Sequence, residues 1–322
     1  MSDSAVDALQ LFAEARGGDR GSLARLLTLV ERGGGSLAEV ARISWPESGA
    51  AQVVGLTGSP GAGKSTLTNA LCGEFRGRST RVGVLAVDPS SPFSGGAILG
   101  DRVRMGDHAL DPDVFIRSMA TRGHLGGLAV ATPAAARVLD AVGFDPVVIE
   151  TVGVGQVEVE VAAAADTTVV VVNPGWGDAV QAAKAGLMEI ADIFVINKAD
   201  REGAGETRRD LESSLALAPR SGWRPPVLDT VATEGAGVQD LVDSIGEHRE
   251  WLAESGEGAE RRRRRLTEEL AAVVGAEVAR RAEVLLSGPL WDEALAAVTS
   301  GGADPWTAAG RLIDGGGDAL TD

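Results

Sequence analysis

The sequence predicts an α/β protein with a mostly parallel sheet covered by helices, and with helical extensions at both ends. Six short, mostly unbroken apolar runs alternate with helical stretches between residues 51 and 251, and such runs are typical of strands buried on both faces. The segments before and after that region have helical spacing instead. The predicted strands are Gln52–Thr57, Arg81–Val87, Pro146–Ile149, Thr167–Val172, Ile193–Ile196 and Pro226–Val231.

The two ends of the chain differ from the middle. Apolar positions between residues 5 and 31 recur at helical spacing and are interrupted at Arg16–Gly21, which predicts two short helices. After Trp251 the strand-like runs stop, and the Gly/Glu-rich stretch Glu254–Glu260 leads into Ala/Leu-rich segments. We therefore predict a helical extension over residues 1–48, an α/β domain over 49–253 and a second helical extension over 254–322.

Composition limits the possible partners. The 322 residues carry a net charge of −16, which repels phosphate backbones and anionic lipid, so we expect neither nucleic acid nor a membrane as partner. The single cysteine, Cys72, excludes an internal disulfide, and neither a signal peptide nor an apolar run of membrane-spanning length is evident. These features predict a cytoplasmic protein.

Five consecutive arginines, Arg261–Arg265, are the main basic feature of the chain. Acidic residues flank the run on both sides, including Glu260 and Glu268. Against the acidic background of the whole chain, the run is interpreted as a solvated helix start or a subunit contact rather than a nucleic-acid site.

A phosphate-binding loop follows the first predicted strand. The pattern G-x-x-x-x-G-K-S lies between an apolar strand and a helix, the setting in which backbone N–H groups and a helix N-terminus bind phosphate. Lys64 is predicted to serve the β- and γ-phosphates catalytically, and the Ser65 hydroxyl to bind Mg2+. The predicted nucleotide contacts are Gly58, Ser59, Pro60, Gly61, Ala62, Gly63, Lys64, Ser65 and Thr66.

Three acidic residues are candidates for the metal site, because Mg2+ prefers carboxylate, hydroxyl and phosphate oxygens. Asp88 and Glu150 each follow a predicted strand, and Asp101 lies in a Gly-rich loop. We predict all three as metal ligands, and count Glu150 and Asp101 among the catalytic residues. Gly153 is placed to offer its amide to the γ-phosphate. Gln156 is predicted to orient the attacking water, although a plain loop role fits it almost as well.

The strand Ile193–Ile196 runs into Asn197-Lys198-Ala199-Asp200, an N-K-x-D pattern. The Asp200 carboxylate can accept hydrogen bonds from guanine N1–H and the 2-amino group, whereas adenine offers no such pair of donors. Lys198 is predicted to lie over the base, Asn197 to brace the loops, and Ala232 to contact the guanine O6 through its backbone. Together with the phosphate loop, this pattern predicts a GTPase that binds GTP and GDP.

At this point the chain resembles the MeaB/ArgK-type GTPases, relatives of the metallochaperone GTPases for hydrogenase and urease. The glutamate in Glu150-x-x-Gly153, where most GTPases use aspartate, is particularly telling. The segments that carry the resemblance are Thr57–Thr66, Val87–Pro92, Gly95–Asp101, Asp113–Arg117, Leu125–Gly127, Glu150–Gln156 and Asn197–Asp200.

The resemblance implies a GTP-gated chaperone of an adenosylcobalamin-dependent acyl-CoA mutase, most often methylmalonyl-CoA mutase, which controls the loading and ejection of the cofactor. It also implies a homodimer formed through the C-terminal extension, and a mobile switch containing Trp176, Asp178 and Lys184. For Trp176, simple packing under the helix Ala179–Ile190 remains open. The alternatives are a metal-insertion GTPase, for which the chain offers only Cys72 and three dispersed histidines, and a small-molecule kinase.

Overall fold

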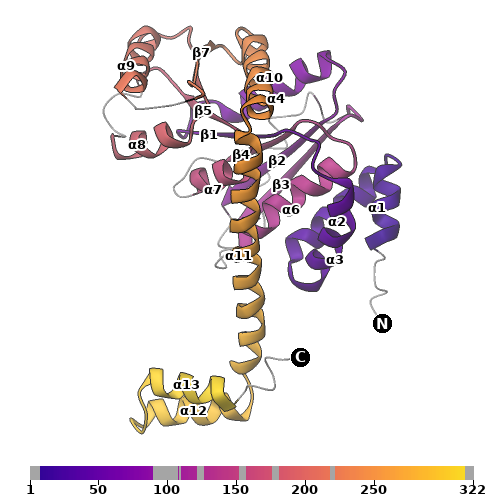
Figure 1. Cartoon of the computed structure of the whole chain (residues 1–322), viewed down its shortest axis with the longest axis vertical. Coiled ribbons are helices and arrows are strands. Elements are labelled where there is room, and N and C mark those ends of the chain that lie inside the picture. Colours follow the sequence, from indigo (N-terminus) through magenta and orange to yellow (C-terminus); the bar gives the residue numbers. More distant parts are fainter. Residues whose placement is uncertain are drawn as a thin grey trace. The chain divides into compact units, whose positions relative to one another are not determined.

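The computed structural model describes residues 8–89, 108, 110–121, 127–151, 157–175, 181–217 and 222–315. The described chain forms two compact units, Met1–Thr267 and Glu268–Asp322. The first unit contains a parallel sheet between layers of helices, which confirms the predicted fold class (Figure 1). The division into domains at residues 48 and 253 stays a prediction.

The sheet has seven strands in the order β3-β2-β4-β1-β5-β6-β7, and all neighbours are parallel. All six predicted strands are present, with ends that differ by a residue or two. The four valines that complete β5 are fully buried because helices cover both faces of the sheet. The strands are β1 (Val53–Gly58), β2 (Val82–Pro89), β3 (Val114–Thr121), β4 (Val147–Thr151), β5 (Thr167–Val172), β6 (Ile193–Asn197) and β7 (Val227–Thr230).

Strand β3 was not predicted from the sequence. Its apolar run ends at Arg117 and Ser118, which breaks the continuous pattern used for the other strands. β3 is an edge strand, and Arg117 points toward α2 (Arg20–Arg32), where its guanidinium bonds to Thr28 Oγ1 at 3.1 Å and to the Glu31 carboxylate. The guanidinium group of a strand residue is therefore bonded by a helix far away in the chain.

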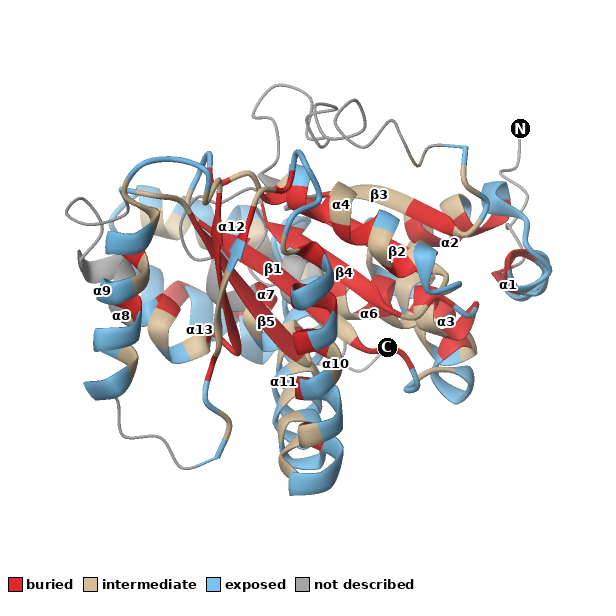
Figure 2. Ribbon diagram, turned by 90° about the horizontal axis from the view of Figure 1, so that it is seen from above, coloured by how far each residue is buried: buried red, intermediate tan, exposed pale blue. Residues whose placement is uncertain are grey.

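Helices cover both faces of the sheet, as the buried residues in Figure 2 show. On one face, apolar residues of β1, β2, β4, β5 and β6 pack with α4 and α10. On the other face, β2, β3 and β4 pack with α6, α7 and the N-terminal helices, and β5 and β6 pack with α8 and α9. These helices are α4 (Lys64–Gly77), α6 (Gly127–Ala141), α7 (Val157–Ala164), α8 (Gln181–Ile190), α9 (Ala204–Leu217) and α10 (Val238–Ser255).

The N-terminal extension forms α1 (Ala8–Arg16), α2 and α3 (Gly34–Ser44) and a short 3-10 turn. The predicted interruption after Arg16 is confirmed, and α2 begins at an N-cap in which the Asp19 carboxylate accepts from Ser22 N at 2.6 Å. The third helix was not predicted separately. Arg20 links this layer to the sheet domain by donating to the carbonyl of Asp111 at 2.8 Å.

The start of α11 (Glu257–Leu285) is fixed to the amino edge of the sheet within the first unit. Arg261 forms a bidentate pair with the buried Asp192, at 3.0 Å for both contacts, and Arg265 pairs with Asp166. Asp192 directly precedes β6, and Asp166 directly precedes β5. The interpretation of the arginine run as a solvated helix start is therefore wrong for these two residues, since their side chains are only 23% and 19% exposed.

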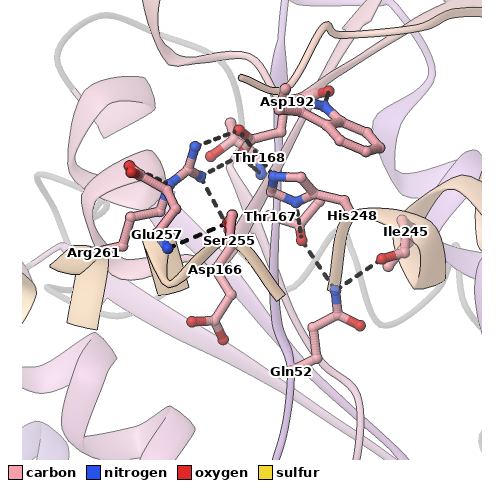
Figure 3. A network of polar contacts seen from close by, with 11 residues as sticks. Gln52, Asp166, Thr167, Thr168, Asp192, Ile245, His248, Ser255, Glu257 and Arg261 are labelled. Carbon is pink, nitrogen blue, oxygen red and sulfur yellow. Dashed lines mark hydrogen bonds and ion pairs between the residues drawn. The ribbon is translucent and has the colours of Figure 1, made fainter. Parts of the chain in front are cut away.

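A buried polar network surrounds this anchor (Figure 3). His248 of α10 contacts Thr167 Oγ1 through Nδ1 at 2.8 Å, and Gln52 donates to the same hydroxyl at 3.0 Å. The imidazole forms a cluster with the rings of Trp223 and Trp251, in which the three ring centroids are 4.8 to 5.7 Å apart. Burial lowers the pKa of His248, so that the ring is neutral at neutral pH.

The described part of the second unit consists of the rest of α11, α12 (Pro289–Thr299) and α13 (Pro305–Gly315). Helices α12 and α13 pack against each other. Its apolar side chains are unusually exposed. Leu270, Val274 and Val278 recur every fourth residue along α11 and are between 54% and 64% exposed, and Trp306 is 88% exposed. The described residues of this unit thus leave an apolar stripe uncovered.

Candidate functional site

The phosphate loop lies at the carboxyl edge of the sheet, between the end of β1 at Gly58 and the start of α4 at Lys64. β1 is the central strand, and the chain continues to β2 on one side of it and later to β5 on the other. Such a point of divergence is where open parallel sheets bind ligands. The N-terminus of α4 adds the positive end of its dipole to this edge, which suits an anion.

Two glycines of the loop are required by close contacts. Gly58 has φ +136°, and a Cβ there would come within 1.9 Å of Val171 O on β5. Gly63 has φ +91°, and a Cβ there would come within 2.5 Å of Asn197 Nδ2. Lys64 is buried, and its ammonium donates to Gly58 O at 2.7 Å and Ser59 O at 3.1 Å. The lysine therefore folds back over the loop that the glycines shape.

Glu150 lies on β4 opposite Leu56 of β1, with a side chain that is only 1% exposed. One carboxylate oxygen accepts from Ser65 Oγ at 2.6 Å and the other accepts from Thr68 Oγ1 at 2.8 Å. The structure thus brings together Ser65 and Glu150, two predicted ligands of the metal site. A carboxylate beside a phosphate-loop hydroxyl is a set of hard oxygen donors, and it fits Mg2+.

The N-K-x-D loop is tied directly to the phosphate loop. Asn197 Nδ2 donates to Ala62 O at 2.8 Å, and Lys198 Nζ donates to Gly61 O at 2.7 Å. The Asn197 amide oxygen accepts from Thr230 Oγ1 at 3.1 Å and from Ala232 N at 3.2 Å. Asn197 therefore joins the phosphate loop, β6 and the segment after β7, while the Asp200 side chain is exposed beside them.

Several predicted site residues lie outside the described part of the chain. Asp101, Gly153, Gln156, Trp176 and Asp178 belong to this group. For Asp88, at the end of β2, and Lys184, in α8, the backbone is described and the side chain is not. Their assignments stay predictions.

Sequence reasoning missed three polar residues of the site. Thr68, fully buried in α4, contacts Glu150, and Asn173 accepts from Ser59 Oγ at 3.4 Å. Thr230 completes the bonds of Asn197. Of these, only Thr68 left a signal in the sequence: it is three residues after Ser65, so both hydroxyls lie on one face of the helix.

Of the cysteine and histidines that a metal-insertion GTPase would need, the structure describes Cys72, His108 and His248, and these three are buried or bonded to other residues. Cys72 is fully buried, and burial, together with the nearby Glu150 charge, raises its pKa to about 12. His108 contacts Asn69 O, and His248 contacts Thr167. Across the residues that the structure describes, no group of three or more His, Cys, Asp and Glu side chains is arranged to hold a metal. Among the described helices, none combines the length and the apolar character needed to cross a bilayer.

Solved structures and named relatives resemble this chain over most of its length. The crystal structure of a LAO/AO transport system kinase superposes with a TM-score of 0.71 at 29% identity, covering 95% of this chain and 96% of that one. A Pyrococcus abyssi protein that carries the name GTPase is 51% identical over 308 residues, 94% of this chain and 95% of the relative.

Two further relatives carry more specific names. GTPase ArgK of Escherichia coli is 39% identical over 250 residues, 75% of this chain and 76% of its own. The mouse protein named methylmalonic aciduria type A homolog, mitochondrial, is 40% identical over 214 residues, 65% of this chain and 52% of its own. Residues 23–285 match the family described as methylmalonyl Co-A mutase-associated GTPase MeaB. The chain, with its phosphate loop and N-K-x-D loop joined at the carboxyl edge of the sheet, belongs to the MeaB family and is a GTPase.

Proposed function

We propose that this GTPase is a GTP-gated chaperone of an adenosylcobalamin-dependent acyl-CoA mutase, most simply methylmalonyl-CoA mutase. In this role it hydrolyses GTP to GDP and phosphate, and the nucleotide state controls when the cofactor is loaded or released. The observation that supports it best is the membership of the chain in a family described by its association with that mutase. The name of the mouse relative points to the same metabolism.

At the phosphates, the loop from Gly58 to Thr66 would bind through backbone N–H groups, and Lys64 would move its ammonium from the loop carbonyls to the β- and γ-phosphates. Ser65 and Glu150 would hold Mg2+, with Asp88 and Asp101 as the further carboxylates. When bound, Mg2+ neutralises charge on the phosphate oxygens. Gly153 and Gln156 are assigned to the γ-phosphate and the attacking water.

At the base, Asp200 would accept from the guanine N1–H and 2-amino groups, and Lys198 would cover the ring. The exposed Asp200 carboxylate on a loop that Asn197 braces supports this assignment. Ala232 would offer its backbone N–H to the guanine O6. In the structure this N–H donates to Asn197 Oδ1 at 3.2 Å, which places Ala232 beside the N-K-x-D loop.

Coupling to the mutase is assigned to Trp176, Asp178 and Lys184, which lie between β5 and the first turns of α8. β5 also leads to Asn173, the partner of Ser59 in the phosphate loop. A segment attached to the nucleotide site at one end can take different positions in the GTP and GDP states, as a gate requires.

We expect Asp178→Ala and Lys184→Ala to keep basal GTP turnover within about 2-fold of the parent, since the phosphate and base contacts lie elsewhere, and to lose its stimulation by the mutase. Turnover of the full chain with and without methylmalonyl-CoA mutase, alongside cofactor transfer, measures both effects. Lys64→Ala is the control that lowers turnover under either condition. A parent enzyme that the mutase does not stimulate would exclude the chaperone role, whereas normal stimulation of both variants would remove only the switch assignment.

We also infer a homodimer formed through the C-terminal helices. The apolar stripe of Leu270, Val274 and Val278 on α11 is exposed in the isolated chain, and burying it against a second copy would remove these side chains from water. A stripe that recurs at helical spacing suits a partner helix.

Replacing Leu270 and Val274 together by lysine should convert the dimer into a monomer, because two charges would have to be buried in the interface. Sedimentation velocity of the full chain gives the mass of each form. Glu268→Lys, on the same helix outside the stripe, is the matched control and should stay dimeric. A parent chain that sediments as a monomer at micromolar concentration would contradict the proposal.

A further inference from the structure

We propose that Thr68 is a positioning residue for the metal site, which holds the Glu150 carboxylate in the orientation that Mg2+ binding requires. This inference rests on the proposed assignment of Glu150 to the metal. It starts from the two hydroxyls of α4, Ser65 and Thr68, which donate to the two oxygens of one carboxylate at 2.6 and 2.8 Å.

The position of Thr68 is determined by the fold. Glu150 points to the same face of the sheet as Val148, the face that packs against α4. On α4, Ser65, Thr68 and Cys72 follow one another at helical spacing, so Thr68 occupies the turn below Ser65. The Thr68 side chain is fully buried, and Glu150 is 1% exposed, so little water reaches the contact between them.

The Thr68 hydroxyl has one proton and two acceptors within reach, Lys64 O at 3.1 Å and Glu150 Oε2 at 2.8 Å. The carboxylate is closer and carries a negative charge, and a hydrogen bond to a charged acceptor is the stronger one. The Thr68 hydroxyl therefore donates its hydrogen bond to Glu150. This leaves Oε1, the oxygen beside Ser65, directed at the end of the phosphate loop.

A glutamate needs such a partner more than an aspartate does. Its extra methylene adds a rotatable bond, and a carboxylate held at only one oxygen can turn about its terminal torsion, which is broad. Contacts that orient a metal ligand typically change metal affinity by about 10- to 100-fold when they are removed. Thr68 supplies this contact from the same helix that carries Ser65.

The test is Thr68→Val, which keeps the shape of the side chain and removes the hydroxyl. The measured quantity is the ratio of the dissociation constants of a fluorescent GDP analogue in EDTA and in Mg2+, which reports how strongly Mg2+ and nucleotide assist each other. We expect this ratio to fall by about 10-fold in Thr68→Val. The affinity in EDTA should stay unchanged, because Gly58 O and Ser59 O hold the Lys64 ammonium, whereas the Thr68 hydroxyl meets Lys64 at its backbone carbonyl in α4.

Two control variants separate the hydroxyl from packing. Thr68→Ser keeps the hydroxyl and should keep the parent ratio. Thr132→Val replaces another buried threonine, in α6, whose hydroxyl has no hydrogen-bond partner among the described residues, and it should change nothing. If Thr68→Val does not fold, as thermal unfolding of the full chain would reveal, Thr68→Ala takes its place in the same comparison.

Glu150→Gln distinguishes failure of this inference from failure of the metal assignment. If Glu150→Gln lowers the ratio and Thr68→Val leaves it unchanged, Thr68 does not position the metal ligand, and the metal site stands. If Glu150→Gln also keeps the parent ratio, Glu150 is not a metal ligand, and the proposed metal site fails. A Thr68→Ser variant that behaves like Thr68→Val would attribute the effect to packing and overturn the role of the hydroxyl.

Discussion

Asp200→Asn is expected to exchange the base that this GTPase recognises, from guanine to xanthine. The aspartate can only accept hydrogen bonds, which suits the two donors of guanine, N1–H and the 2-amino group. An asparagine accepts from N1–H through its oxygen and donates to the C2 carbonyl of xanthine through its nitrogen. Sites built around such hydrogen bonds reject a mismatched ligand by up to about 10^4-fold, so we expect a loss of GTP affinity of at least about 100-fold.

Competition of GDP and xanthosine diphosphate against a fluorescent nucleotide measures the exchange. Asp210→Asn, at an exposed position on α9, is the matched control and should keep the preference for guanine. Because Asn197 and Lys198 make the described contacts to the phosphate loop and Asp200 makes none of them, the variant should keep its fold and its phosphate affinity. Equal binding of adenine and guanine nucleotides by the parent chain would show that the N-K-x-D loop does not read the base.

Arg261→Ala is expected to lower the free energy of unfolding by about 3 kcal/mol. It removes the bidentate partner of Asp192, a carboxylate that is only 7% exposed. What then remains near the carboxylate is the N–H of Thr168, at 2.9 Å, and the His248 ring, whose Nε2 lies 3.4 Å from it. A buried charge left without its partner costs more than the intact pair contributes, and the partial exposure of Arg261 places the effect at the lower end of the usual range.

Urea unfolding of the full chain, followed by tryptophan fluorescence, should show the change, since Trp223 donates to Asp192 O at 2.7 Å and reports on this edge of the sheet. Arg263→Ala is the matched control within the same run of arginines, because Arg263 pairs only with the exposed Glu260 in the contacts described, and such a pair is worth less than about 1 kcal/mol. If both variants unfold at the parent midpoint, the pair with Asp192 does not hold this part of the fold.

The parts of the molecule that local sequence determines were predictable. The buried strands, the phosphate loop and the N-K-x-D loop each depend on residues adjacent in the chain, and the β5 run of valines is an example. Strand β3 was not predictable in the same way, because Arg117 disrupts its apolar pattern and finds its partners in α2. Arg261 and Arg265 were misinterpreted for the same reason: their carboxylate partners are 69 and 99 residues away.

The proposed metal site was predictable only in part. Ser65 and Glu150 could be proposed from the loop motif and from the end of a strand, but their contact depends on the packing of α4 against β4. Thr68 has no motif of its own, and its importance appears only when the partner carboxylate is located. Contacts between helices and strands that are distant in sequence therefore could not be predicted from the sequence alone.

The anchoring of α11 determines where this protein can be divided for experiments. A fragment that ends at residue 253, where composition changes, would lack Arg261 and Arg265 and would leave Asp192 and Asp166 without their cations. A fragment that ends after Thr267 keeps both pairs and omits the exposed stripe of α11. Truncation at these two points should therefore give an insoluble or easily digested product in the first case and a well-behaved nucleotide-binding fragment in the second.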